Sequence, residues 1–196
     1  MYLVNDQTAR SNAIRTGLGV DPGRTNGGVC LVQLADAAPH VVLGGWAWTL
    51  RSVKAGDVWR LTDTLGRVSD HGSLHGVGEA IVSRLGVDVY TLTLEGLYVD
   101  ALKKASRIIT LAEAAGEVVG PLRRGCVGPV RRPLASVWRG KVLRLGRASA
   151  AVCAARAVEC APLVATGLGA LEGNEHACEA LCIGYYGLVM AGRDDA

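Results

Sequence analysis

The hydrophobic positions of the chain fall first into short runs that suit β-strands. Thr16 to Val20 and Gly28 to Leu34 are such runs, on either side of the turn-forming segment DPGRTNGG. Val41 to Thr49 and the β-branched run VDVYTLTL at 87–94 continue the pattern, and Val127 to Val130 is a further short candidate. We therefore predict five strands, the first two joined by a tight turn.

Apolar residues recur at intervals of three and four in much of the remaining chain, which is typical of amphipathic helices. The pattern is clearest in residues 100–119, where Gly120 and Pro121 are expected to end the helix. The other predicted helices are 57–70, 77–85, 137–145, 148–158 and 175–190. This order of elements indicates an α/β fold with a central mixed five-stranded sheet flanked by helices.

A chain of 196 residues, 49% apolar and 20% charged, has the size and composition of one globular domain. We assign residues 16–191 to that domain, 1–15 to an N-terminal extension and 192–196 to a C-terminal tail. The longest run without a charged residue, 37–50, is shorter than the ~18 residues that a transmembrane helix needs. The first fifteen residues show no secretory pattern, and the six cysteines form no paired motif. We expect a cytoplasmic protein with reduced thiols and no membrane contact.

Positive charge is concentrated in one stretch of the chain. The protein carries a net charge of +3, but residues 100–147 hold eleven Lys and Arg against three acidic residues, which leaves −5 on the rest. Such a stretch fits a protein that binds a phosphate backbone. A solvated helix face, whose long side chains cover apolar surface, would give the same pattern. Charge alone leaves both interpretations open.

Two acidic residues directly follow predicted strands. Asp21 ends the run Gly-Leu-Gly-Val-Asp, and Glu95 ends Leu-Thr-Leu-Glu. Side chains at the carboxyl ends of strands in such a sheet point into the crevice where ligands bind. If the two strands are neighbours, the carboxylates converge, and two converging anions imply a proton or a metal cation between them. Alternatively, Asp21 begins an Asp-Pro-Gly turn and Glu95 is a solvated strand end.

The last predicted helix begins with acidic and imidazole groups in an otherwise apolar segment, EHACEALCIGYYGLVM. His176 and Glu179 are three residues apart and share a helix face, as do Glu175 and Glu179. We expect the apolar remainder to pack on the sheet and the charged pair to lie at the sheet edge. Helix capping by Asn174, together with first-turn acids, would explain the same residues without a functional site.

Four motif residues occur in a fixed order: Asp21 in GVDPGRTNGG, Glu95 in LEGLYVDALKKASRIITLAEAAGEV, and His176 with Glu179 in NEHACEALCIGYYG. In order, spacing and flanking residues the chain resembles the RuvC family of Holliday-junction resolvases. The resemblance covers about residues 16–190 and includes the basic segment SVWRGKVLRLGRASA before the last helix. It implies an RNase H-like fold, a homodimer, and Mg²⁺-dependent cleavage of four-way DNA junctions by paired symmetric nicks.

The resemblance also implies roles for the four motif residues. Asp21, Glu95, His176 and Glu179 match the family's catalytic tetrad, which would hold two Mg²⁺ ions, with Mn²⁺ as a substitute. Oxygen ligands suit these ions, and His176 is either a further ligand or the group that positions or deprotonates the attacking water. The sequence does not separate these two roles of His176.

Contacts to DNA are implied as well. Tyr98 matches an aromatic residue that stacks on a base at the junction centre, while a core or rim tyrosine would look the same. The expected backbone contacts are Arg139, Lys141, Arg144 and Arg147, with Lys103, Lys104 and Arg107 as a second basic surface.

Two positions depart from the family pattern. Glu179 stands where the family usually has Asp, and its extra methylene requires an offsetting shift in metal geometry. Ala150 and Ala151 occupy the neighbourhood where a lysine is expected, with Arg147 as the nearest cation. We expect an active enzyme, of weaker activity or different selectivity.

Two other function classes fit parts of the sequence. A non-catalytic RNase H-like module that binds branched nucleic acid would carry the same motifs without cleaving. DPGRTNGG also looks like the phosphate loop of actin-like sugar kinases and ATPases, but those folds need a second such domain, for which 196 residues leave no room.

Three further features are expected to be structural. His71 and His75 lie among glycines, which favours a surface loop over a zinc site. Cys178 and Cys182 share a helix face and are expected to be packing thiols. Trp138 is expected to anchor the basic segment against the domain.

Overall fold

A central mixed sheet organises the molecule. The computed structural model describes residues 15–35, 39–54, 56–96, 105–145 and 148–194, without the side chains of 105–107 and 191–194. The sheet has the order β5-β4-β3-β2-β1-β6-β7, with β8 paired to β3. The pairs β1–β6, β6–β7 and β3–β8 are parallel, and the other pairs are antiparallel. The strands are β1 (Thr16–Asp21), β2 (Asn26–Gln33), β3 (His40–Val53), β4 (Gly56–Asp63), β5 (Val68–His71), β6 (Thr91–Leu94), β7 (Val130–Arg131) and β8 (Ala165–Thr166).

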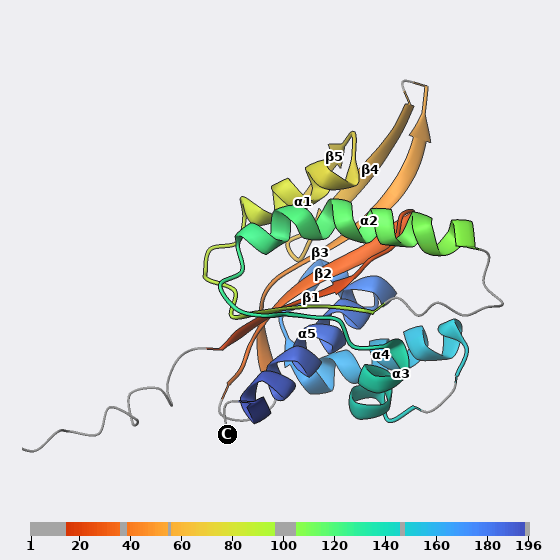
Figure 1. Ribbon diagram of the computed structural model, residues 1–196. Helices are drawn as coiled ribbons and strands as arrows, with labels where there is room; N and C mark the ends of the chain where they lie inside the picture. The colour runs from red at the N-terminus through yellow and green to blue at the C-terminus, as the bar shows by residue number, and fades with distance from the viewer. Residues whose placement is uncertain (1–14, 36–38, 55, 97–104, 146–147, 195–196) are drawn as a thin grey trace, which may run out of the picture.

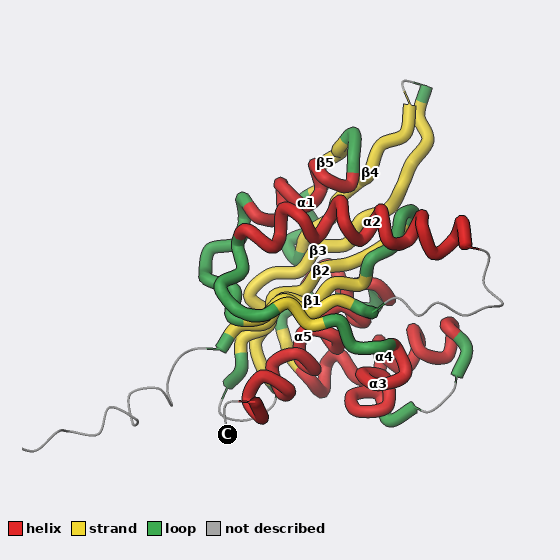
Figure 2. Tube along the Cα trace, viewed as in Figure 1, coloured by secondary structure: helices red, strands yellow, loops and turns green. Residues whose placement is uncertain are grey.

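Helices cover both faces of this sheet (Figures 1 and 2). One face carries α1 and α2, and the other carries α3, α4 and α5. The helical elements are α1 (Leu74–Val82), α2 (Ala105–Arg124), α3 (Ala135–Trp138), a π-helical turn η1 (Arg139–Leu143), α4 (Ala150–Val164), a 3₁₀ turn η2 (Gly169–Leu171) and α5 (Glu175–Asp194). In the part of the chain that the structure describes, none of these helices is long and apolar enough to cross a membrane.

The alternation of side chains along the strands produces two apolar cores. Leu18 and Val20 of β1 join the core under α1 and α2. Cys30 and Val32 of β2 point the other way and join the core under α4 and α5. Successive strand residues face opposite sides of a sheet, so a sheet covered on both faces needs apolar residues at nearly every central position.

The α/β architecture with a mixed sheet is confirmed, but the described residues form eight strands rather than the expected five. Residues 57–70, expected to be helical, instead form β4, a turn and β5. Asp63 Oδ1 accepts hydrogen bonds from the backbone N–H groups of Leu65 and Arg67, at 2.9 and 3.0 Å, and Gly66 has a positive φ of 75°. This turn chemistry closes a hairpin that apolar spacing alone does not reveal.

Two predicted helix ends are also wrong. Gly120 and Pro121 do not stop α2, which continues to Arg124. The last turn is held because Pro121 and Leu122 are buried against neighbouring elements, and this burial offsets the missing proline hydrogen bond. Similarly, α4 passes the expected end at Val158 and, with Pro162 inside it, reaches Val164. Of the strand run 87–94, only Thr91–Leu94 forms regular sheet.

Candidate active site

The site begins where β1 and β6 end side by side. The strands pair in parallel, with Gly19 opposite Thr93 and Val20 opposite Leu94, and the Glu95 N–H faces Val20 O at 3.4 Å. The condition set by the sequence, that the two strands be neighbours, is therefore met. The carboxylates of Asp21 and Glu95 follow adjacent parallel strands at one edge of the sheet.

Glycines let α5 approach this edge through its backbone. A Cβ placed on Gly19 would lie 1.9 Å from Ala180 O, and one placed on Gly28 would lie 2.4 Å from His176 O. Neither separation is compatible with a side chain, so α5 rests directly on β1 and β2. This contact brings the first turns of α5, with His176 and Glu179, to the end of β1.

His176 is hydrogen bonded to Asp21. Its Nδ1 donates to Asp21 Oδ2 at 2.7 Å across 155 positions of the sequence. This hydrogen bond is the main cause of a raised pKa for His176, against the opposing effect of burial, with smaller contributions from Asp21, Glu179 and Glu175 charges. The Asp21 carboxylate thus orients the ring and favours its protonated form.

Glu179 is the most buried carboxylate of the set, with the residue only 8% exposed. The pKa of Glu179 is raised to about 7, chiefly by burial and further by the negative charges of Asp21 and Glu95, while Arg139 and His176 act in the opposite direction. A charged group beside a buried carboxylate has a large effect on the pKa of that carboxylate, since little water remains to solvate the anion. Glu179 therefore lies within the electrostatic field of both strand-end carboxylates.

Glu95 is held by two residues that precede and open the π-helical turn. Trp138 Nε1 donates to Glu95 Oε2 at 3.1 Å, and Arg139 Nη2 donates to the same oxygen at 3.2 Å. Arg139 Nη2 is also 3.9 Å from Glu179 Oε1. Trp138 is fully buried, as expected of an anchor for the basic segment. Its contact with Glu95 could not be seen in the sequence, because 43 positions separate the two residues.

The structure thus brings the four motif residues to one edge of the sheet. His176 contacts Asp21 there, and Arg139 lies between Glu95 and Glu179. Among the described residues, no three His, Cys, Asp or Glu side chains are already arranged around a single ion position. The donor chemistry nevertheless fits a divalent cation, because three hard carboxylates and an imidazole lie at one edge of the sheet and one carboxylate is buried. Asn174 Oδ1 also caps α5 by accepting from Ala177 N at 3.0 Å, so capping and site geometry coexist.

The expected DNA contacts separate into several groups. Lys141 and Arg144 are exposed, and Arg144 has a positive φ of 58° where the π-helical turn ends. Arg139, from the same basic segment, is turned inward to the carboxylates. Tyr98, Lys103, Lys104 and Arg147 lie outside the described residues, as does the side chain of Arg107.

The residues expected to be structural are so placed. His71 lies at the end of β5, where Nε2 is 2.9 Å from Ser69 Oγ, and His75 in α1 pairs with Glu79 at 3.2 Å. The prediction of a surface loop for these histidines is therefore wrong, because His71 ends a strand and His75 lies in a helix. All six cysteines are free and buried, and burial raises the pKa of Cys178 to about 11, so these thiols are packing groups.

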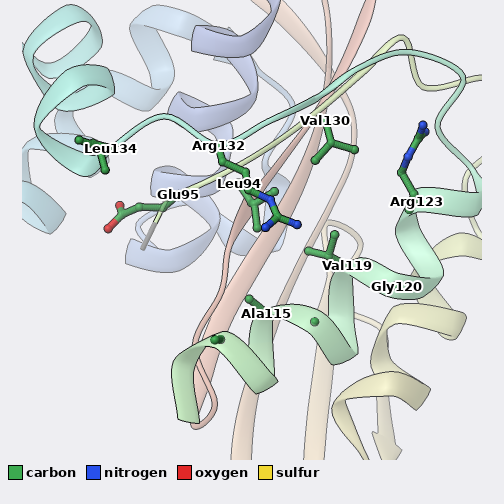
Figure 3. A pocket seen from close by; sticks show the side chains of 12 residues that line it. Leu94, Glu95, Ala115, Val119, Gly120, Arg123, Val130, Arg132 and Leu134 are labelled. Atoms are coloured by element: carbon green, nitrogen blue, oxygen red, sulfur yellow. The ribbon is translucent and has the colours of Figure 1, made fainter. Parts of the chain in front are cut away.

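A groove of about 670 Å³ opens beside Glu95, between α2 and the strand edge of β6 and β7 (Figure 3). Small residues of α2, including Ala115 and Gly120, form one wall, and Val130 and Leu134 contribute to the other. Arg123 and Arg132 also line it. Figure 3 shows Glu95 at one end, with its side chain pointing away from the Arg123 end. Sequence reasoning did not identify this groove.

Comparisons with known proteins define the fold. No protein-family model matches the chain, and no curated protein matches it. Among solved structures, the chain is similar to the Thermus thermophilus RuvC structure, with 15% identity, a TM-score of 0.54, and coverage of 91% of this chain and 96% of that one. It is also similar to T. thermophilus RuvC in complex with Holliday junction substrate, with 13% identity, a TM-score of 0.53 and the same coverage. The chain therefore has a RuvC-like fold of the RNase H type, and its four motif residues stand at one edge of that fold's sheet.

Proposed function

We propose that this protein is a metal-dependent, structure-selective endonuclease that resolves four-way DNA junctions by paired symmetric nicks. The observation that carries the proposal is the placement of Asp21, Glu95, Glu179 and His176 together at the end of the parallel β1–β6 pair. The RuvC-like fold supports it, since one of the similar structures is a complex with Holliday junction substrate.

In this proposal the three carboxylates hold Mg²⁺, two ions to a site, with Mn²⁺ as a substitute. When bound, such ions lower the pKa of the attacking water and stabilise the leaving 3′ oxygen. Asp21 engages Nδ1 of His176, so in this proposal Nε2 is the ring nitrogen that would act on substrate, water or ion. Trp138 and Arg139 donate hydrogen bonds to the Glu95 carboxylate.

Exposed cations near the site would bind the DNA backbone. Lys141 and Arg144 are solvent-exposed at the π-helical turn, whose first residue contacts Glu95. On the other side of Glu95, the groove lined by Arg123 and Arg132 offers a second positively charged surface. Cations on both sides of a carboxylate centre would guide a phosphodiester into it while the carboxylates themselves repel it.

Paired symmetric nicks require two active sites related by a two-fold axis, and we therefore propose a homodimer. Sedimentation of the full chain at micromolar concentration should show a dimer. A strict monomer, with and without junction DNA, would contradict paired resolution. The cytoplasmic location expected from the sequence stays a prediction.

The decisive experiment incubates the protein with a labelled synthetic four-way junction or a matched linear duplex, in Mg²⁺, Mn²⁺ or EDTA. We expect symmetric, metal-dependent nicks in the junction alone, mapped on a denaturing gel. Glu95→Gln should abolish cleavage while keeping junction binding, and Glu117→Gln, at an exposed position of α2, should cleave normally. Cleavage of all branched forms would indicate a debranching nuclease with relaxed selectivity. Tight binding without cleavage in either metal would instead establish a non-catalytic module.

A further inference from the structure

Arg139 occupies an unusual position for a residue of a basic surface. Its guanidinium lies between two carboxylates, 3.2 Å from Glu95 Oε2 and 3.9 Å from Glu179 Oε1. The three side chains are all largely buried, with 19%, 24% and 11% of their side-chain surface exposed for Arg139, Glu95 and Glu179. The guanidinium is thus a positive charge placed inside the carboxylate cluster.

The backbone around Arg139 is also unusual. Arg139 opens the π-helical turn η1, which ends at Arg144 in a left-handed conformation. Turns of this kind are rare and often occur at functional sites. The preceding residue, Trp138, is fixed in the core, and the Arg139 guanidinium lies 5.3 Å from its ring centroid. A buried tryptophan therefore holds the base of the arginine, while the arginine itself lies on an irregular turn.

The contacts of the guanidinium are incomplete. Arg139 Nε is buried and has no hydrogen-bond partner among the described residues. The contacts of 3.2 and 3.9 Å to the two carboxylates are made through Nη2, and its separation from Glu179 Oε1 is longer than a hydrogen bond. A buried cation with an unsatisfied donor is stabilised less than a fully paired one, because the lost hydration is not replaced.

We propose that Arg139 is the resident counter-ion of the site, and that it competes with a divalent cation for Glu95 and Glu179. Two carboxylates attract a compact double charge more strongly than a delocalised single one, and the hard oxygens suit Mg²⁺ and Mn²⁺. Entry of the cation displaces the guanidinium. The displaced side chain returns to the exposed surface of Lys141 and Arg144, where the sequence placed it. This inference rests on the proposed metal site but not on nuclease activity.

The test is a titration of Mn²⁺ into the full-length protein without DNA, with free Mn²⁺ measured by electron paramagnetic resonance. Arg139→Met removes the charge and keeps an apolar stem, and we expect it to bind Mn²⁺ at least about tenfold more tightly than the wild type. The control, Lys141→Met, removes an exposed positive charge from the same turn and should change Mn²⁺ affinity by less than about twofold, since solvent screens it. Arg139→Lys retains the charge and should bind more weakly than Arg139→Met.

A second measurement protects the test against poor folding of a variant. In EDTA, Arg139→Met should have a lower thermal midpoint than the wild type, and Mn²⁺ should raise this midpoint more than it raises that of the wild type. Equal or weaker Mn²⁺ binding by Arg139→Met, or an equal gain in Lys141→Met, would overturn the competition and leave the proposed nuclease intact. Absence of Mn²⁺ binding in every variant would overturn both. Tight Mn²⁺ binding without junction cleavage would count against the nuclease alone.

Discussion

The two faces of the central sheet are packed in different ways. Under α1 and α2, large side chains such as Leu18, Leu92 and Trp48 fill the space between helices and strands. Under α5, the helix meets β1 and β2 at glycines, and backbone touches backbone at Gly19 and Gly28. Apolar side chains can repack when one of them changes, whereas a backbone contact has no such freedom.

The difference matters because the candidate site lies on the α5 face. His176 and Glu179 stand on the helix that is placed by backbone contact, and their partners stand at the ends of the strands it touches. Reactive groups must be held within fractions of an ångström, and a contact without adjustable side chains provides that constraint. The α1–α2 face then contributes stability through side-chain packing, whereas the backbone contact on the α5 face, beside an apolar core of its own, fixes the position of the helix.

The largest expected effect on stability comes from the side-chain-packed face. Leu92→Ala, at a fully buried position of β6, should lower the free energy of unfolding by about 3 kcal/mol because it leaves a cavity. Urea denaturation followed by circular dichroism measures this, with Leu163→Ala on the exposed surface of α4 as the matched control. Junction cleavage per folded molecule should be unchanged. A large loss of cleavage at full folding would break the proposed division between the faces.

The next effect is a dependence of the free energy of unfolding on pH. The pKa of Glu179 is raised to about 7 in the folded protein, chiefly by burial, so folding takes up a proton between pH 4.5 and 7. Stability is therefore highest below the unfolded pKa of Glu179 and falls as the pH rises through 7, by up to a few kcal/mol (~1.4 kcal/mol for each pKa unit). The raised pKa of His176 acts in the same direction above pH 6.5.

Denaturation in EDTA at several pH values measures this dependence. Glu179→Gln should remove most of the fall between pH 4.5 and 7, and Glu175→Gln, at an exposed position of α5, should retain it. An undiminished fall in Glu179→Gln would show that another group titrates.

A glycine variant sharpens the comparison on the site's own face. A Cβ at Gly28 would meet His176 O at 2.4 Å and Ala177 N at 2.9 Å, both backbone atoms. Gly28→Ala should therefore displace the start of α5, lower stability by about 1–2 kcal/mol, and reduce cleavage by about 10²-fold. Cleavage assays and urea denaturation provide the two readouts. Gly72→Ala, at a position with open space, is the control, and equal behaviour of the two variants would refute the role of the backbone contact.

The smallest effect is expected where a tryptophan ties down the turn after Asp21. Trp59 Nε1 donates to Arg24 O at 2.7 Å, and Trp59→Phe should cost about 0.5 kcal/mol through loss of this exposed hydrogen bond. Trp46 Nε1 has no partner among the described residues, so Trp46→Phe should cost nothing by this route. Thermal denaturation compares the two, and an equal loss would assign the effect to ring packing instead.

The sequence predicted the site best where it lies at strand ends. The runs before Asp21 and Glu95 have clear strand character, and parallel pairing of two such strands brings their ends together. The hairpin of β4 and β5 was missed because Val58, Leu61, Leu65 and Val68 happen to recur at helical intervals. The feature that distinguishes a hairpin from a helix here is the turn formed at Asp63 and Gly66, and the spacing of apolar residues does not reveal it.

The position of Arg139 was beyond sequence reasoning for a different reason. The sequence places it correctly in a basic segment, but its contacts are to residues 44 and 40 positions away. Arg139 follows the fully buried Trp138 and opens the π-helical turn, and this tertiary arrangement accompanies its inward orientation. The contact of α5 with Gly19 and Gly28 was also missed, because a glycine in a strand sequence does not indicate which neighbouring element approaches it.

Contact between backbones also determines which substitutions a chain can accept. Backbone atoms are the same in every residue, so the contact of α5 with the sheet restricts the positions where a Cβ would meet backbone, which are Gly19 and Gly28 in the strands and Gly184 in the helix. Two chains can then differ at most positions and still superimpose, as this chain does with a RuvC structure at 15% identity. The positions of the candidate site residues therefore depend on glycines, whose lack of a side chain lets the helix approach the strands. A comparison of residue types gives such positions very little weight.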